Sequence, residues 1–262
     1  MAEFGSVAGK VVLITGASSG IGEGTALYLA RAKCRLSLTG RKLERLQEVS
    51  KKCQELGLPE KDIFIIAGDM EKDDDIKNIL DKTVEYFGKL DSLINNAGGG
   101  TYVKTMDTSL AVLDNTMAVN VRAPFYLTQL AVPHLIKTQG SIINISSISG
   151  QKAFQGATAY CMSKAALDHF SRILAMELAK DNVRVNIVSP GVIITDFQKR
   201  AGMSDERYVT YLQEQERLQP LGGAGTPEQV AKIIKFLISD ESGLITGENI
   251  HADGGRHVLA PQ

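Results

Sequence analysis

The sequence has few of the residues that mark disulfide-linked or metal-binding proteins. Its 262 residues include only three cysteines and four histidines. Cys34, Cys53 and Cys161 cannot all pair and form no CxxC motif, so we expect free thiols in a reducing compartment, the cytoplasm. The histidines have no spacing typical of metal ligands, and we therefore predict no metal site.

Charge and hydropathy argue against two further classes of protein. The formal net charge is −1, which gives no electrostatic basis for binding nucleic acid or an anionic membrane. No apolar run approaches the roughly 20 residues of a membrane-spanning helix. The N-terminus lacks a basic region followed by an apolar one, so we expect no signal peptide. Residues 2–6, AEFGS, are native or a cloning remnant, and we leave them out of the fold prediction.

Short apolar runs alternate with helix-like stretches along most of the chain. The runs are almost continuously hydrophobic, which is typical of strands buried on both faces of a sheet. Strands separated by helices form βαβ units, and these predict a parallel sheet with right-handed crossovers in a single domain. We expect strands at 10–16, 34–40, 62–69, 90–98, 140–147, 183–191 and 248–255 and helices at 21–33, 41–56, 72–87, 109–138, 158–180 and 227–239.

One polar stretch, residues 192–225, breaks this alternation. It is rich in Gln, Arg and Glu and follows a predicted strand, so we expect it at the edge where parallel sheets bind ligands. A surface helical hairpin and a lid over a substrate both fit this stretch, and we favour the lid.

A glycine-rich turn joins the first predicted strand to the first helix. Gly16, Gly20 and Gly22 allow a tight turn and a close approach of phosphate to the helix N-terminus. Their GxxxGxG spacing differs from the GxGxxG of the general dinucleotide fingerprint. The same stretch also satisfies GxSxG, the nucleophile elbow of α/β-hydrolases, with Ser18 as the nucleophile. A serine hydrolase is the poorer hypothesis, because an elbow serine belongs in mid-domain.

Tyr160 and Lys164 lie one turn apart on the same face of a predicted helix. A neighbouring cation lowers the pKa of a phenol from its ordinary value of about 10, because the cation stabilises the phenolate. The pair is therefore a candidate proton donor. A pair of this kind also arises by chance, and other motifs have to support it.

Taken together, the motifs resemble those of the short-chain dehydrogenases/reductases. The family's TGxxxGIG, NNAG and YxxxK patterns match residues 15–22, 95–98 and 160–164, in the family's order. The resemblance covers residues 7–256. It implies a Rossmann-like, doubly wound α/β fold with a seven-stranded parallel sheet in the order 3-2-1-4-5-6-7 and helices on both faces. It also implies a homotetramer or a homodimer.

The resemblance further implies hydride transfer between a nicotinamide cofactor and a small-molecule carbonyl or alcohol. Tyr160 would be the general acid/base, Ser147 would orient the substrate oxygen, and Lys164 would lower the tyrosine pKa and bind the nicotinamide ribose. Asn120 would hold a water that relays protons, whereas we expect Ser146 to be a solvated loop hydroxyl. The implied cofactor contacts are Gly16, Ser18, Ser19, Gly20, Ile21, Gly22, Arg41, Lys42, Asp69, Met70, Asn96, Ala97, Gly98, Tyr160, Lys164, Pro190, Gly191, Ile193 and Thr195.

The end of the second predicted strand favours NADP(H) over NAD(H). Proteins of this kind that bind NAD carry an acidic residue there, whereas this chain has Gly40 followed by Arg41 and Lys42. A guanidinium group suits a 2′-phosphate. Ser18 and Ser19 stand where many NADP-binding members of the family have a further basic residue.

Apolar residues in the variable loops suit a lipophilic carbonyl such as a steroid, a retinoid, a 3-oxoacyl compound or a xenobiotic. A non-catalytic NADP(H)-binding sensor or scaffold with the same fold remains the alternative from another functional class.

Overall fold

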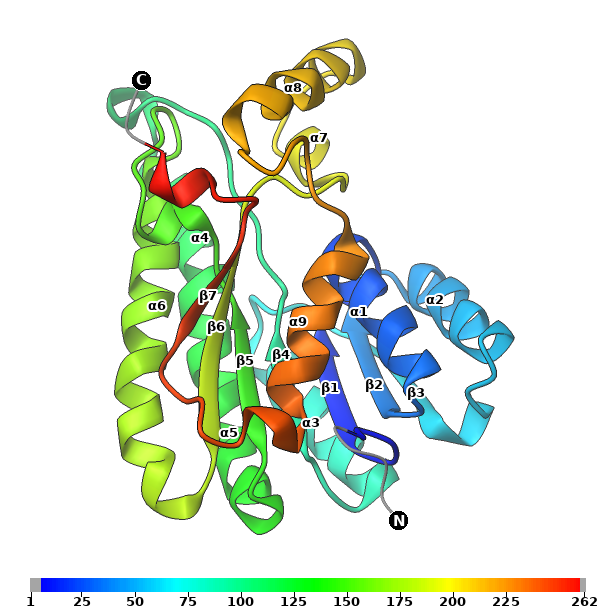
Figure 1. Ribbon diagram of the computed structural model, residues 1–262. Helices are drawn as coiled ribbons and strands as arrows, with labels where there is room; N and C mark the ends of the chain where they lie inside the picture. Colours follow the sequence, from blue (N-terminus) through cyan, green and yellow to red (C-terminus); the bar gives the residue numbers. More distant parts are fainter. Residues whose placement is uncertain (1–5, 260–262) are drawn as a thin grey trace.

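A parallel sheet of seven strands forms the centre of the molecule, whose computed structural model describes residues 6–259 (Figure 1). Of the N-terminal segment left out of the fold prediction, only Ser6 lies within the described residues. The strand order is β3-β2-β1-β4-β5-β6-β7, as predicted. The strands are β1 Val11–Thr15, β2 Arg35–Gly40, β3 Ile63–Ala67, β4 Ser92–Asn95, β5 Ser141–Ile145, β6 Arg184–Pro190 and β7 Asn249–Ala252.

Helices cover both faces of this sheet, with α1, α2 and α9 on one side and α3, α5 and α6 on the other (Figure 1). Strand β1 shows why its sequence is continuously apolar: Val12 and Ile14 enter the first core, whereas Val11 and Leu13 enter the second. The helices are α1 Gly20–Arg31, α2 Leu43–Glu55, α3 Asp73–Phe87, α4 Leu110–Met117, α5 Ala123–Thr138, α6 Thr158–Leu178, α7 Phe197–Arg200, α8 Asp205–Leu218 and α9 Pro227–Ile238.

The stretch predicted as one helix over 109–138 is interrupted. A π-helical turn, Ala118–Arg122, separates α4 from α5. Asn120 lies in this turn and is completely buried. Apolar periodicity does not reveal a π turn, because the hydrophobic face continues on both sides of it. Such insertions are frequent at functional sites.

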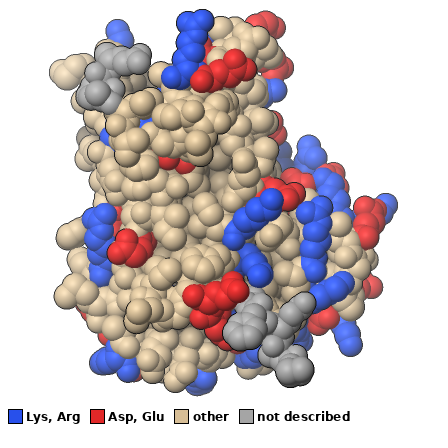
Figure 2. Space-filling view, in the orientation of Figure 1, with Lys and Arg blue, Asp and Glu red and all other residues tan. Residues whose placement is uncertain are grey.

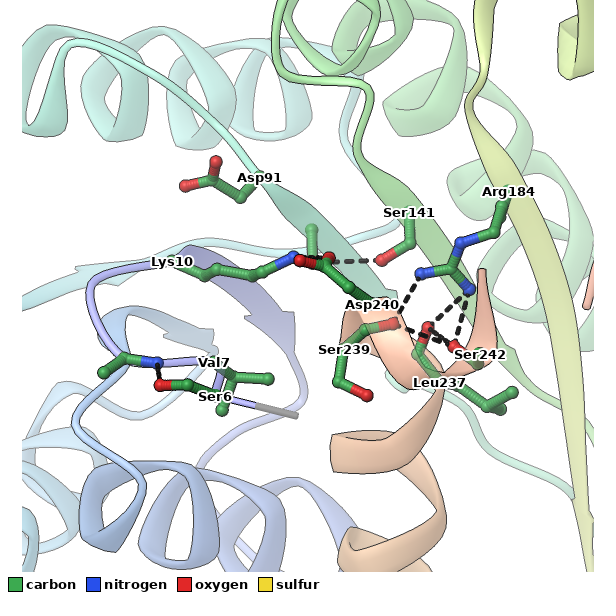
Figure 3. Close-up of polar contacts among 12 residues, drawn as sticks. Ser6, Val7, Lys10, Asp91, Ser141, Arg184, Leu237, Ser239, Asp240 and Ser242 are labelled. Carbon is green, nitrogen blue, oxygen red and sulfur yellow. Dashed lines mark hydrogen bonds and ion pairs between the residues drawn. The ribbon is translucent and has the colours of Figure 1, made fainter. Parts of the chain in front are cut away.

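Polar contacts join the amino end of β6 to the segment at the end of α9 (Figure 3). Arg184, at the start of β6, donates hydrogen bonds to the backbone carbonyls of Leu237 and Ser239 and to the hydroxyl of Ser242. These bonds satisfy carbonyl groups at the C-terminal end of α9, which have no partner within the helix. Arg184 therefore ties α9 to the sheet on the side opposite the carboxyl ends.

The polar stretch 192–225 folds as two helices, α7 and α8, at the carboxyl edge of the sheet (Figure 1). Tyr208 in α8 donates a hydrogen bond to the carbonyl of Thr195, 2.9 Å away, which holds α8 over the end of β6. The stretch is therefore helical and also borders the ligand-binding edge, so the two hypotheses for it do not exclude each other.

Candidate functional site

A cleft of about 840 Å³ opens along the carboxyl ends of the strands. It extends from the glycine-rich turn after β1, past Ser147 and Tyr160, to α7, α8 and Arg256 near the C-terminus. All residues predicted to contact the cofactor line it except Gly22, and all predicted catalytic residues line it except Asn120. The fold thus brings together motifs that are far apart in the sequence.

Gly22 acts from behind the cleft by letting α1 pack against the turn. A Cβ atom on Gly22 would lie only 2.3 Å from the carbonyl oxygen of Gly16. Gly16 itself has a φ of 65°, a conformation that favours glycine. The Asn96 amide donates to the carbonyls of Thr15 and Gly16, at 2.8 and 3.3 Å, so Asn96 pins the same turn.

The N-terminus of α1 faces this cleft without a side-chain cap. Ser19 is the N-cap residue, but its hydroxyl accepts no hydrogen bond from the first turn. The free N–H groups and the positive end of the helix dipole therefore favour an anion. Arg200 from α7 adds a positive charge by donating to the Ser19 hydroxyl at 3.2 Å. This set of donors fits the diphosphate of a dinucleotide.

The end of β2 offers positive charge and no carboxylate. Arg41 and Lys42 are exposed, line the cleft and form no ion pair among residues 6–259. Asp69, which follows β3, uses one carboxylate oxygen to accept the backbone N–H of Glu71 at 3.1 Å. This end of the cleft therefore presents two free cations beside an acidic turn.

Ser147, Tyr160 and Lys164 meet at the other end of the cleft, where β5 ends and α6 begins. The Ser147 hydroxyl lies near enough to the Tyr160 hydroxyl to affect its pKa. The Tyr160 ring lies against Phe197 of α7, with 5.6 Å between ring centres. Lys164 is 4% exposed; its Nζ donates to the carbonyl of Ile145 at 2.9 Å and lies 5.7 Å from the Tyr160 ring centre.

Burial controls the protonation of this group more than mutual attraction does. Desolvation raises the pKa of Tyr160, and the nearby Ser147 hydroxyl opposes this only in part. Desolvation also lowers the pKa of Lys164 to about 8, against the opposing charge of Asp168. The net pKa of Tyr160 is therefore raised, whereas we predicted that it would be lowered. Tyr160 is protonated at neutral pH, as a proton donor must be.

Asn120 and Ser146 are both buried and form hydrogen bonds within the protein. The Asn120 amide donates both its hydrogens within the protein, to the Gly99 carbonyl at 2.8 Å and to Ser163 at 2.9 Å, while its oxygen accepts from the Gly99 N–H. Both amide hydrogens are therefore used within the protein, and the role of Asn120 in holding a relay water stays a prediction. Ser146 is buried rather than solvated and donates to the Lys164 carbonyl at 3.4 Å, because α6 covers the end of β5.

Several cleft residues were not singled out in the sequence because they belong to no motif, although most of them lie in stretches that we expected near the substrate. They come from the loop after β4, from α7 and α8, and from the chain after β7, and sequence spacing alone does not place these segments together. Their positive or aromatic character, or for Gln198 its place in the stretch 192–225, could have drawn attention to them. They are Tyr102, Gln198, Arg200, Tyr211 and Arg256.

The serine hydrolase hypothesis is wrong. Ser18 follows β1, whereas His251 lies on β7, four strand positions away in the sheet or about 19 Å. His251 is hydrogen-bonded to Gln151 at 3.0 Å, and His257 is paired with Asp253 at 2.9 Å. Neither histidine serves Ser18 as a base.

The described residues contain no group of three or more His, Cys, Asp or Glu side chains placed to hold a metal ion. The three cysteines are free, and burial raises the pKa of both Cys34 and Cys53 to about 12, which suppresses their thiolates at neutral pH. Among residues 6–259, no helix is both long and apolar enough to cross a membrane.

Comparison with known proteins agrees with this geometry. A family model described as enoyl-(acyl carrier protein) reductase matches residues 16–257. The 3-oxoacyl-[acyl-carrier-protein] reductase FabG of Thermotoga maritima is 39% identical over 254 residues, which cover 94% of this chain and 97% of the relative. An NAD-dependent glycerol dehydrogenase of Listeria innocua is 33% identical over 95% of this chain and 94% of its own length.

The fold is also similar to that of a solved structure. The crystal structure of a short-chain dehydrogenase/reductase of unknown function from Caenorhabditis elegans, with cofactor, superimposes with a TM-score of 0.91. It is 35% identical, and the match covers 97% of each chain. The present chain therefore belongs to the short-chain dehydrogenase/reductase family, oxidoreductases that use a nicotinamide cofactor, NAD or NADP, on small-molecule substrates.

Proposed function

We propose that this protein, as a single domain over residues 7–256, interconverts a ketone or aldehyde and its alcohol with NADP(H). One observation carries the proposal. A half-buried, protonated Tyr160, close to Ser147 and next to Lys164, lies at one end of a cleft whose other end fits a dinucleotide.

The cofactor would be held along the length of the cleft. The first turn of α1 would bind its diphosphate, and Tyr160 and Lys164 would lie at the nicotinamide end. Arg41 and Lys42 favour the phosphorylated cofactor, because they are unpaired cations next to Gly40, where no carboxylate is present to bind ribose hydroxyls. The bound cofactor supplies the hydride.

The residues of the chain manage the proton. Negative charge develops on the carbonyl oxygen during reduction, and Ser147 donates a hydrogen bond that orients this oxygen. Tyr160 gives its proton to the oxygen and becomes a phenolate. The Lys164 ammonium, protonated below its pKa of about 8, stabilises that phenolate. Alcohol oxidation runs the same transfers in reverse.

The substrate would be a lipophilic carbonyl compound: a steroid, a retinoid, a 3-oxoacyl compound or a xenobiotic. Aromatic and apolar side chains line the substrate end of the cleft, among them Tyr102, Phe154, Val192, Phe197 and Met203. Burying such surface against a ligand is worth about 25 cal/mol per Å². The three free cysteines support a reducing location, the cytoplasm.

Self-association would bury apolar side chains that the described chain leaves exposed. Phe125 on α5 is 50% exposed, and Ile173 and Met176 on α6 are 45% and 82% exposed. Figure 2 shows that the face around the edge strand β7 also carries few charges compared with the face over α2. We propose that these surfaces form a homodimer or a homotetramer.

Replacing Tyr160 by phenylalanine tests the proposed reaction. The change removes the proton and little volume, so we expect NADPH oxidation with a reactive ketone to fall about 10²- to 10⁴-fold. NADPH binding, followed by calorimetry, should change less than about threefold. Tyr86→Phe, at an exposed tyrosine outside the cleft, is the matched control. Full activity in Tyr160→Phe would contradict the mechanism, and a wild type inactive on a broad carbonyl panel would favour the sensor or scaffold.

A further inference from the structure

The outer end of the cleft holds a positive charge that the proposed reaction does not use. Arg256 lies in the short turn that follows β7 and lines the cleft. None of the ion pairs among residues 6–259 involves it. The nearest acid along the chain, Asp253, accepts the backbone N–H of His257 at 2.6 Å and pairs with the His257 ring. Arg256 is therefore a cation without a carboxylate partner.

The side chains that contact the Arg256 guanidinium, Gln215 and Phe154, are neutral. Its Nη1 donates to the side-chain oxygen of Gln215 in α8, and its guanidinium lies 5.3 Å from the centre of the Phe154 ring. A guanidinium has five N–H groups, more than these contacts use. It remains able to bind the two oxygens of a carboxylate side by side.

Two tyrosines beside Arg256 add hydroxyl donors. Tyr102 is 45% exposed and Tyr211 is partly buried, and desolvation within the cleft raises the pKa of both, so both are protonated at neutral pH. The Arg256 guanidinium and the Gln198 side chain lie near the Tyr211 hydroxyl and oppose this rise of its pKa. A protonated Tyr211 can donate a hydrogen bond to a ligand. Gln198 lines the cleft, is 7% exposed and has a side-chain oxygen without a partner.

This group of donors belongs to the same cleft as the reacting hydroxyl. Tyr102, Tyr211, Tyr160 and Arg256 all line this cleft. The two tyrosines are therefore available, together with Arg256, to a ligand that enters it. A ligand whose carbonyl reaches Tyr160 extends past them towards Arg256.

Contacts with two other segments hold Arg256 in place. Lys152, in the loop that follows Ser147, donates to the backbone carbonyls of Arg256 and Leu259, at 3.2 and 2.7 Å. The Gln215 contact joins Arg256 to α8 on the other side. A donor that is already positioned loses little freedom when a ligand binds, which favours affinity.

We propose that the substrate is an oxo carboxylic acid whose carboxylate binds Arg256 and Tyr211 while its carbonyl lies at Tyr160. This inference rests on the proposed carbonyl chemistry and narrows its substrate class to a lipophilic body with an anionic end. Arg256 acts as the residue that determines specificity, and Tyr211 acts as its partner.

A series of methyl-keto acids of increasing chain length, each beside its methyl ester, tests the inference. The wild type should prefer the best acid over its ester by about tenfold or more in kcat/KM. Arg256→Gln should lower kcat/KM for the acid about 10- to 100-fold and change that for the ester less than about threefold. Tyr211→Phe should lower the preference by a smaller factor, and Arg256→Lys should retain part of it. Arg217→Gln is the matched control, because Arg217 is exposed on α8 and does not line the cleft.

If Arg256→Gln lowers kcat/KM equally for acid and ester, Arg256 only supports the fold and the inference is wrong. The inference is also wrong if the wild type has equal kcat/KM for an acid and its ester. Calorimetric titration of the acids and esters separates this result from failure of the proposed function. If no compound is turned over but the acids still bind more tightly than the esters in an Arg256-dependent way, the carboxylate site stands and the carbonyl chemistry fails.

Discussion

Replacing Lys164 by methionine is expected to change how the stability of the protein depends on pH. Lys164 is 4% exposed and keeps its ammonium next to Tyr160 at a cost to the folded state. Desolvation lowers its pKa from the ordinary value of 10.5 to about 8. Each pKa unit corresponds to about 1.4 kcal/mol, so burying this charge costs the folded protein roughly 3 kcal/mol below pH 8.

The sign of the effect follows from the two pKa values. Between pH 8 and 10.5 the unfolded chain still binds the lysine proton, whereas the folded protein has released it. The free energy of unfolding of the wild type therefore gains this contribution as pH rises across that window. Methionine has no proton to release, so the variant lacks the gain. The carbonyl of Ile145 loses its donor in the variant at every pH, which lowers stability by a pH-independent amount of about 1–3 kcal/mol.

Urea unfolding followed by circular dichroism, at several pH values from 7 to 10.5, measures the difference between wild type and variant. We expect this difference in the free energy of unfolding to shift in favour of the wild type by roughly 3 kcal/mol across the range. Lys137→Met is the matched control, because Lys137 is exposed on α5 and forms no ion pair among the described residues. A difference that stays constant with pH would refute the argument, since it would mean that the Lys164 ammonium is not desolvated.

Three shorter predictions address the cofactor, the fold and the assembly. Arg41→Ala should weaken NADPH binding about 10- to 100-fold and NADH binding less than about threefold; equal weakening in a fluorescence titration would contradict the 2′-phosphate contact. Arg184→Met removes three hydrogen bonds at the base of α9 and should lower the free energy of unfolding by about 2–4 kcal/mol, measured in urea. Phe125→Asp should shift the light-scattering mass towards the monomer; an unchanged oligomer would place the interface elsewhere.

Local patterns in the sequence predicted the sheet and most of the helices. The continuous apolar runs predicted parallel strands because both faces of each strand are covered, and β1 shows this with its two sets of side chains in two cores. The predicted strand order came from the family resemblance, and the structure confirms it. The π turn around Asn120 was missed, because one additional residue in a helical turn leaves the apolar pattern intact.

The sequence predicted the relative position of Tyr160 and Lys164 better than it predicted the pKa of Tyr160. Sequence spacing placed Lys164 near Tyr160, and the structure does bring them together. The direction of the tyrosine pKa shift was wrong, because desolvation depends on everything that packs around the phenol, including Phe197 from a distant segment. The spacing of two residues in a sequence does not reveal which side chains from other segments pack around them and exclude water.

The sequence by itself determined the fold class, the glycine-rich turn and the series of polar residues from Ser147 to Lys164, because each depends on neighbours a few positions apart or on motifs in a known order. Only the tertiary structure decided that Ser146 is buried, that Ser18 has no histidine, and that Arg256 shares a cleft with Tyr160. These properties depend on segments brought together by the sheet and its loops, and charge and burial arise from that three-dimensional arrangement.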